Sequence, residues 1–310
     1  MKKIDRFIIY PVCLITFIVV AFFDFQISSS LFDPNNVFGQ SFEMIGEAFF
    51  QLLFCFSSFY CFLNRDKSTK KRNIIYSILF ILSILISNLY GGGQIRSYVN
   101  GILRMHLNYG YIPLFGLIYV ALTLPFAIFA SRWSLDSKTL FNVCLSIIIL
   151  YISIWIVMNI LKVFWFRPRY RFLAKIYNGE EIKSHWLPFY MPQGWWSFAK
   201  YQPHIDLAGG VEVKFDDCFS FPSGHTMNSL GIISLSYFPY FAKDKYKSIT
   251  VRIFSYIWGG LVALSRIYRG AHNPTDVVMG YFLGILIFDL VFSLVYPRLN
   301  KEKEKATEVA

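Results

Sequence analysis

Charged residues are scarce in this chain. Asp, Glu, Lys and Arg make up only 16% of its 310 residues, whereas hydrophobic residues make up 55%, and the mean hydropathy is +0.45. A soluble domain of this length carries far more charge on its surface. The shortage therefore excludes an ordinary soluble protein and predicts an all-α fold, a polytopic membrane helix bundle.

Cysteine patterns and internal repeats are also lacking. Four of the five cysteines lie in apolar runs, Cys218 lies in a loop, and no CxxC pair is present. This pattern excludes a disulfide framework and a cysteine-based metal site. No internal or inverted repeat is visible, which weakens the interpretation of the chain as a transporter.

Apolar runs long enough to cross a bilayer dominate the rest of the chain. We expect eight spans, at about Phe7–Phe23, Met44–Leu63, Ile74–Tyr90, Tyr111–Ala130, Leu140–Leu161, Gly224–Ala242, Ile249–Ile267 and Val277–Tyr296. Gly91-Gly92-Gly93 is expected to end the third span as a flexible connector. The division predicted from these runs is two N-terminal helices in 1–73, a six-helix core in 74–296 with an outer loop at 163–221, and a tail at 297–310.

Positive charge is unevenly distributed between the connectors. The connector at 24–43 contains no Lys or Arg, whereas the next, at 64–73, contains five. The positive-inside rule puts the second connector in the cytoplasm, so both termini are predicted to be cytoplasmic. The net charge of +11 is then explained by topology and by contact with anionic membrane lipids, and nucleic acid is not an expected partner.

The segment 265–276 places ionisable side chains at a membrane edge. Asn273-Pro274 should begin a helix, so Asp276 is expected to hydrogen-bond the imidazole of His272, leaving the other ring nitrogen as a nucleophile or base. Arg266 is close enough in sequence to hold an anion beside it. The alternative is an ordinary polar loop, although ionisable clusters at this depth are usually functional.

Two further stretches have the chemistry of an anion site. Lys162 closes the fifth span, and Arg169 follows on the side where positive charge is not favoured by topology, so an anionic substrate explains both. The alternative is anchoring by aromatic residues and snorkelling cations. The sixth span begins with Ser223-Gly224-His225, where the serine hydroxyl and a free amide at the helix end suit a phosphate. His225 would be an acid or base beside it. The alternative is a simple serine cap.

Taken together, the three stretches resemble the signature of the type-2 phosphatidic acid phosphatase family, which includes lipid phosphate phosphatases and is related to vanadium-dependent haloperoxidases. That family has the patterns KxxxxxxRP, PSGH and SRxxxxxHxxxD. The second and third match letter for letter. In the first, Lys162 and Arg169 have the right separation, but Tyr170 replaces the proline and Arg167-Pro168 lies at another offset. The first two spans go beyond the family's six-helix core and resemble longer bacterial members.

The resemblance implies a role for each matched residue. His272 would attack phosphorus and form a phosphohistidine, Asp276 would orient it, and His225 would act as acid and then base. The phosphoryl oxygens would be held by Lys162, Arg169, Ser223, Gly224 and Arg266. No metal and no cofactor is expected, because the cations take the place of Mg²⁺ and no acidic pair suits a metal.

The sequence thus predicts an integral membrane phosphatase that hydrolyses a lipid phosphate or diphosphate at the extracytoplasmic face of the plasma membrane. Undecaprenyl diphosphate, phosphatidylglycerol phosphate, phosphatidic acid and a lipid A phosphate all fit as substrates. A phosphotransferase using the same intermediate, and a non-catalytic phospholipid binder or transporter, are the alternatives. A haloperoxidase is disfavoured, because its chemistry does not call for eight spans.

Overall fold

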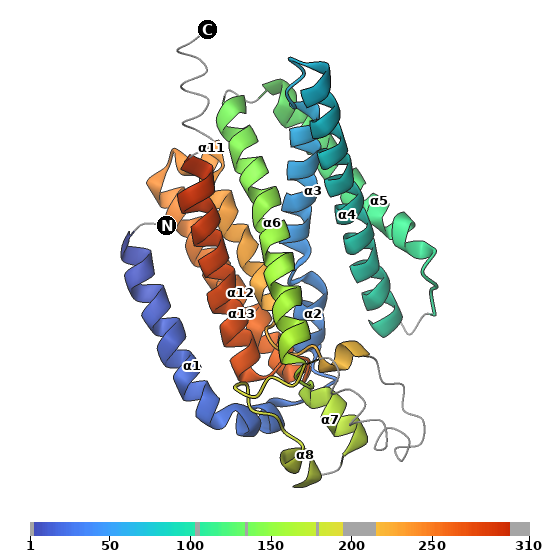
Figure 1. The fold of residues 1–310 in the computed structure, drawn as a ribbon, viewed down its shortest axis with the longest axis vertical. Coiled ribbons are helices and arrows are strands. Elements are labelled where there is room, and N and C mark those ends of the chain that lie inside the picture. Colours follow the sequence, from blue (N-terminus) through green and yellow to red (C-terminus); the bar gives the residue numbers. More distant parts are fainter. Residues whose placement is uncertain (1–2, 103–105, 134–135, 178–179, 195–214, 298–310) are drawn as a thin grey trace. The chain divides into compact units, whose positions relative to one another are not determined.

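The computed structural model describes residues 3–102, 106–133, 136–177, 180–194 and 215–297. Within these ranges every regular secondary-structure element is helical, as Figure 1 shows. The predicted all-α membrane fold is therefore confirmed. The helices form because the runs are uniformly apolar and long, so that all backbone polar groups are satisfied inside each segment.

Seven helical segments in the described ranges are long and apolar enough to cross a membrane. They are formed by α1 (Lys3–Leu31), α2 with α3 (Val37–Ile45 and Ala48–Leu63), α4 (Lys70–Ile102), α5 (Tyr111–Trp133), α6 (Ser137–Trp165), α12 (Lys245–Tyr268) and α13 (Pro274–Leu290). Large apolar side chains on these helices, such as Phe7, Phe22 and Phe126, are exposed. Exposed apolar side chains on helices of this length are suited to contact with lipid. The chain is therefore a multi-pass membrane protein.

The expected sixth span, at 224–242, differs from the others. It consists of α10 (Gly224–Ser229), the 3₁₀ segment η3 (Leu230–Tyr237) and α11 (Pro239–Ala242), so it contains no long α-helix. The hydroxyls of Ser229 and Ser234 donate to carbonyl oxygens three residues earlier, at 2.8 and 2.6 Å. Such side-chain bonds compete with regular helix geometry. They explain why the described residues form seven candidate spans where eight were expected.

The glycine run on the third span does not end it. Helix α4 continues through Gly91, Gly92 and Gly93 to Ile102, so the expected flexible connector was wrong. A Cβ atom on Gly92 would lie 2.0 Å from the Ile112 carbonyl oxygen. The glycines therefore allow α5 to pack closely against α4, as small residues do between membrane helices.

Two compact units make up the chain, each built from three segments. The first comprises Met1–Gly46, Ser153–Leu230 and Ile257–Leu286, and the second comprises Glu47–Ile152, Gly231–Tyr256 and Ile287–Ala310. The division predicted from the sequence, at residues 73 and 296, stays a prediction about membrane topology.

Buried polar residues hold the second unit together. Tyr90 donates to the Glu47 carboxylate at 2.9 Å, Gln51 donates to the Ser87 carbonyl oxygen at 2.8 Å, and Tyr151 donates to Gln51 at 2.7 Å. A carboxyl group inside an apolar bundle is expensive to bury unless it is hydrogen-bonded. Tyr90 supplies such a bond to Glu47, which favours a structural role for this acid.

The first unit contains all the residues predicted for the site. Gly280 and Gly284 on α13 face the backbone of the 223–227 segment, where added Cβ atoms would lie 2.6 Å from Ser223 O and 3.0 Å from Met227 O. Two residues in the left-handed region, Phe166 (φ 47°) and Gly270 (φ 55°), turn the chain after α6 and α12. A positive φ is unusual for phenylalanine and indicates a conformation imposed by its surroundings.

Candidate active site

The predicted site residues are carried by the ends of helices in the first compact unit. Lys162 and Arg266 lie in the last turns of α6 and α12, whereas Asp276 lies in the first turn of α13. Ser223 caps α10, and Gly224 and His225 begin it. The remaining two residues lie between helices, Arg169 immediately before α7 (Tyr170–Ile176) and His272 between α12 and α13.

His272 is almost fully buried, and its ring is held by a backbone carbonyl. Its Nδ1 atom lies 2.5 Å from the Ser220 carbonyl oxygen. Because a carbonyl can only accept, we assign the proton to Nδ1, which leaves Nε2 with its lone pair. The ring is thus held in the tautomer that a nucleophilic imidazole requires.

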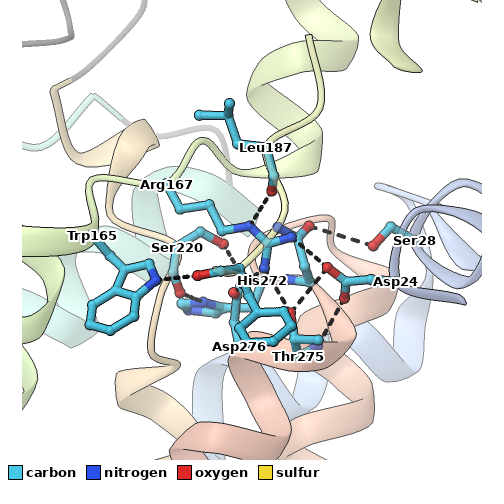
Figure 2. A network of polar contacts seen from close by, with 11 residues as sticks. Asp24, Ser28, Trp165, Arg167, Leu187, Ser220, His272, Thr275 and Asp276 are labelled. Carbon is cyan, nitrogen blue, oxygen red and sulfur yellow. Dashed lines mark hydrogen bonds and ion pairs between the residues drawn. The ribbon is translucent and has the colours of Figure 1, made fainter. Parts of the chain in front are cut away.

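The predicted hydrogen bond between Asp276 and the imidazole is absent. The Asp276 carboxylate instead accepts from Arg167 Nη1 at 2.6 Å, from the Asn273 amide at 2.7 Å and from the Ser220 hydroxyl (Figure 2). The bond to Asn273 resembles a capping box, in which a side chain in the first turn folds back onto the cap residue. Asp276 therefore acts on His272 through Ser220, whose hydroxyl it binds and whose carbonyl holds the ring.

Burial and neighbouring cations keep the His272 ring neutral. Burial lowers its pKa well below the usual value, and the charges of Arg266, Arg169, Lys162 and His225 lower the pKa further. Both causes disfavour an added proton on the ring. These four residues come from three separate stretches of sequence, and all of them act on the pKa of His272.

Two buried guanidiniums retain unused donors. Nε of Arg169 and Nε of Arg266 are buried and have no hydrogen-bond partner in the part of the chain that the structure describes. A buried donor without an acceptor costs free energy, and natural proteins leave few of them. These atoms fit a site whose anion supplies the missing acceptors.

Lys162 and Arg169 act on a common carboxylate. Arg169 Nη1 lies 2.9 Å from Asp216 Oδ2. Burial raises the pKa of Asp216, but the charges of Arg169, Lys162 and Arg171 together lower it below its usual value. Lys162 and Arg169 therefore both stabilise the charged form of this carboxylate, Arg169 through a direct ion pair.

Gly224 allows a close approach between α10 and α6. A Cβ atom at this position would lie 2.2 Å from Met158 Sδ and 3.6 Å from Lys162 Nζ. The glycine is therefore required by packing, and it lies beside the Lys162 ammonium. Ser223 Oγ accepts from the amide and hydroxyl of Thr226, at 3.4 and 2.9 Å, so the helix-cap interpretation of Ser223 is confirmed. Phosphate binding by its hydroxyl stays a prediction.

The sequence analysis assigned no site role to Asp24, Glu43, Ser220 or Arg167. Asp24 pairs with Arg167 beside Asp276. Glu43 pairs with three arginines, at 2.9 Å from Arg266, 2.8 Å from Arg269 and 3.9 Å from Arg171. The available signal was the presence of isolated acids in the connector at 24–43, which contains no Lys or Arg to pair with them.

No group of three or more His, Cys, Asp or Glu side chains is arranged to hold a metal ion among the described residues. The predicted independence from metal stays a prediction.

Comparison with known proteins identifies the family of the chain. A family model described as the PAP2 superfamily matches residues 139–300, more than half of the chain. The chain belongs to the PAP2 superfamily. The match includes every predicted site residue, whereas α1 and α2 of this PAP2 protein lie outside it. Asp24 and Glu43 therefore reach the site from segments that the family model does not cover.

Curated relatives of this PAP2 protein have phosphatase names. The chain is similar to phosphatidylglycerophosphatase B of Bacillus subtilis (strain 168), with 40% identity over 82 residues, which cover 24% of this chain and 39% of the relative. It is also similar to sphingosine-1-phosphate phosphatase 1 of Mus musculus, with 34% identity over 85 residues, covering 27% of this chain and 20% of the relative. The matched segment thus spans well under half of each relative. No solved structure matches the chain.

Proposed function

We propose that this protein is an integral membrane phosphatase that hydrolyses a lipid phosphate or diphosphate through a phosphohistidine intermediate. The observation that carries the proposal is the His272 ring, held at Nδ1 by the Ser220 carbonyl and kept neutral among cations. A neutral imidazole with a free Nε2 is a nucleophile, and the cations around it suit a phosphoryl group.

In the first step, His272 Nε2 attacks phosphorus, the N–P bond forms and the bond from phosphorus to the lipid oxygen breaks. His225 donates a proton to the departing oxygen. Lys162, Arg169 and Arg266 stabilise the equatorial oxygens, where charge is spread in the transition state. The Ser223 hydroxyl and the Gly224 amide are further donors to these oxygens.

In the second step, water attacks the phosphohistidine. His225 takes the proton from the water, the N–P bond breaks, and the electron pair returns to His272 Nε2. Inorganic phosphate leaves and the site is restored. The imidazole ring carries a positive charge between the two steps. The negatively charged Asp276 favours this charged ring, and Ser220 forms hydrogen bonds to both residues.

The proposed site faces the extracytoplasmic side of the plasma membrane, with both termini in the cytoplasm. The support is the distribution of Lys and Arg, with five at 64–73 and none at 24–43. The substrate class is supported by the names of the relatives, which include phosphatidylglycerophosphate and sphingosine 1-phosphate phosphatases.

Phosphate release by the detergent-solubilised protein tests the proposal. The panel contains undecaprenyl diphosphate, phosphatidylglycerol phosphate, phosphatidic acid, a lipid A phosphate and a soluble sugar phosphate. We expect turnover of at least one lipid, abolished in His272→Ala and His225→Ala and retained in the matched control His106→Ala, because His106 is exposed and belongs to the second compact unit. Turnover at the wild-type rate in either site variant would remove the mechanism.

Transfer to another acceptor uses the same residues. Product analysis in the presence of an alcohol separates the two reactions, because hydrolysis yields inorganic phosphate and transfer yields a new phosphate ester. A lipid binder or transporter would bind the lipids without releasing phosphate.

A further inference from the structure

Arg167 is a buried guanidinium held between two carboxylates. One of these is Asp276, and the other is Asp24 on α1, outside the segment that matches the family. We propose that Asp24 is a positioning residue for the reaction: it binds Arg167 and thereby fixes Asp276, Ser220 and the His272 ring. This inference rests on the proposed phosphatase function.

The carboxylate of Asp24 is fully engaged at the start of α13. Its Oδ1 accepts from the Thr275 amide at 2.9 Å, and its Oδ2 accepts from the Thr275 hydroxyl at 3.0 Å and pairs with Arg167 Nη2 (Figure 2). The amides in the first turn of a helix have no partner within it and favour a negative charge. Asp24 therefore binds α13 and Arg167 simultaneously.

A departure from helical geometry precedes this contact. Phe23 in α1 has φ −115° and ψ 16°, which interrupts the helix immediately before Asp24. The bend in α1 can be followed in Figure 1. A side chain that follows a kink is directed differently from its neighbours on a straight helix, and Asp24 is buried although most of the first span is exposed.

The Arg167 guanidinium has nearly all its donors occupied. Its Nη1 donates to Thr275 Oγ1 at 2.7 Å and to Asp276 Oδ1 at 2.6 Å, and its Nε donates to the Leu187 carbonyl oxygen at 2.8 Å. Because a guanidinium is planar and rigid, fixing one edge fixes the other. Asp24 therefore helps to fix the position of Asp276 through Arg167.

From Asp276 the contact continues to the nucleophile. Asp276 Oδ2 accepts from the Ser220 hydroxyl, and the Ser220 carbonyl oxygen lies 2.5 Å from His272 Nδ1. Asp276 is thus two contacts from the ring and Asp24 is four, and these contacts matter for the rate because a small displacement of the nucleophile is costly.

The charges explain why a second carboxylate is needed. Arg167 alone would cancel the negative charge of Asp276. With Asp24 present, the three side chains carry a net charge of −1, so the group retains negative charge beside the Ser220–His272 bond. That charge favours the positively charged ring formed when the N–P bond is made.

The test compares Asp24→Asn with two neighbouring variants in the full-length protein. Asp24→Asn keeps the shape and removes the charge. Asp33→Asn removes an exposed acid nearby in the chain, and Phe17→Ala removes the packing of another α1 side chain against Phe189. We measure Tm, kcat and KM for phosphate release from the lipid that the wild-type protein hydrolyses fastest.

We expect Asp24→Asn to lower kcat by about 10- to 100-fold with KM within about threefold, as for other residues that orient a reacting group. Asp33→Asn should match the wild type, and Phe17→Ala should lower Tm while keeping kcat. A wild-type kcat in Asp24→Asn would overturn the inference. A fall in kcat that is proportional to the fall in Tm in both Asp24→Asn and Phe17→Ala would also overturn it.

Asp24→Glu is the second variant for this test, and it is used if Asp24→Asn does not fold. It keeps the charge but adds a methylene group, which displaces Arg167, so we expect a folded protein with a kcat at least about fivefold lower, because orientation is lost. A wild-type kcat in Asp24→Glu would then indicate that Asp24 only anchors α1.

Binding of orthovanadate separates this inference from the proposed function. Orthovanadate adopts the five-coordinate geometry of phosphoryl transfer, whereas inorganic phosphate resembles the ground state. By thermal-shift titration, Asp24→Asn should weaken orthovanadate binding and leave phosphate binding unchanged, even if no lipid is hydrolysed. Equal orthovanadate affinity in wild type and Asp24→Asn would contradict a positioning role, whereas absent turnover in the wild type would contradict the phosphatase function alone.

Discussion

Arg167 and Arg266 are both buried guanidiniums of the first compact unit, but they differ in how completely they are bonded. Arg167 donates to two carboxylates, a hydroxyl and a carbonyl. Arg266 pairs with Glu43, while its Nε has no hydrogen-bond partner in the described part of the chain. The difference separates a framework arginine from one suited to a ligand, because a guanidinium with donors left over can still receive an anion.

The largest effect is expected from removing the arginine with an unused donor. Arg266→Gln should lower kcat/KM by about 10³-fold, because a donor aimed at the transition-state charge is lost. Its Tm should change little, since Glu43 keeps Arg269 and Arg171 as partners. The measurements are phosphate release and thermal unfolding. An unchanged kcat/KM would place Arg266 among the framework residues.

Removing the fully bonded arginine should act mainly on folding. Arg167→Met leaves Asp24 and Asp276 buried without their cation, and we expect a loss of about 3–5 kcal/mol in the free energy of unfolding. Denaturant unfolding in detergent checks this against Arg72→Met, whose arginine forms an exposed pair with Asp66. If the free energy of unfolding falls by the same small amount in both variants, Arg167 has no special structural role.

A packing variant tests the approach of α10 to α6 beside Lys162. Gly224→Ala places a methyl group 2.2 Å from Met158 Sδ, so we expect a loss of about 1–3 kcal/mol from overpacking and a lower kcat/KM. Met158→Ala in the same chain should recover the stability. Failure of the second change to recover it would show that Gly224 is needed for another reason.

The two arginines should also differ in their effect on the His272 pKa. Arg266 is the neighbouring charge that lowers this pKa most, after burial. Arg266→Gln should therefore raise the pKa, whereas Arg167→Lys should leave it nearly unchanged. Titration of ¹³C-labelled histidine by NMR, with His272→Ala for assignment, provides the measurement, and equal shifts in both variants would contradict the distinction.

The same depressed pKa makes stability depend on pH. Below the ordinary histidine pKa of about 6.5 the unfolded chain takes up a proton that folded His272 resists, so His272 contributes a loss of stability as pH falls below that value. Wild type should therefore lose more stability than His272→Ala between pH 7 and pH 5. A parallel loss in both proteins would show that His272 titrates normally.

The smallest effect is expected from a chelator. EDTA should leave phosphate release unchanged, because in the proposed mechanism Lys162, Arg169 and Arg266 supply the positive charge that a metal provides elsewhere. Loss of activity that is restored by Mg²⁺ would show that the arginines and the lysine are insufficient.

Much of the fold was readable from the sequence because membrane helices need long apolar runs, and those runs are visible without a structure. The exceptions depend on side-chain detail. Residues 224–242 are apolar enough to span, yet serine hydroxyls and close packing divide them into short segments. The run Gly91–Gly93 was predicted to be a flexible connector, because the neighbouring helix that packs against those glycines cannot be recognised from the local sequence.

The site was predicted less completely than the fold. Residues of local motifs, such as His272 and Arg266, could be proposed because the spacing of a motif is visible in the sequence, and their roles stay predictions. Asp24 and Ser220 were missed, because their roles come from contacts between segments distant in the chain. The expected bond from Asp276 to the ring failed for the same reason, since Arg167 and Ser220 compete for its oxygens.

The most direct test of the account is to locate the phosphoryl group during turnover. The purified protein is mixed with a ³²P-labelled lipid phosphate that it hydrolyses, quenched in base, where phosphohistidine survives, and digested for mass spectrometry. The account predicts label on His272, accumulating in His225→Ala if the second step is slowed more than the first, and absent from His272→Ala. Label on any other residue, or turnover without labelled His272, would contradict it.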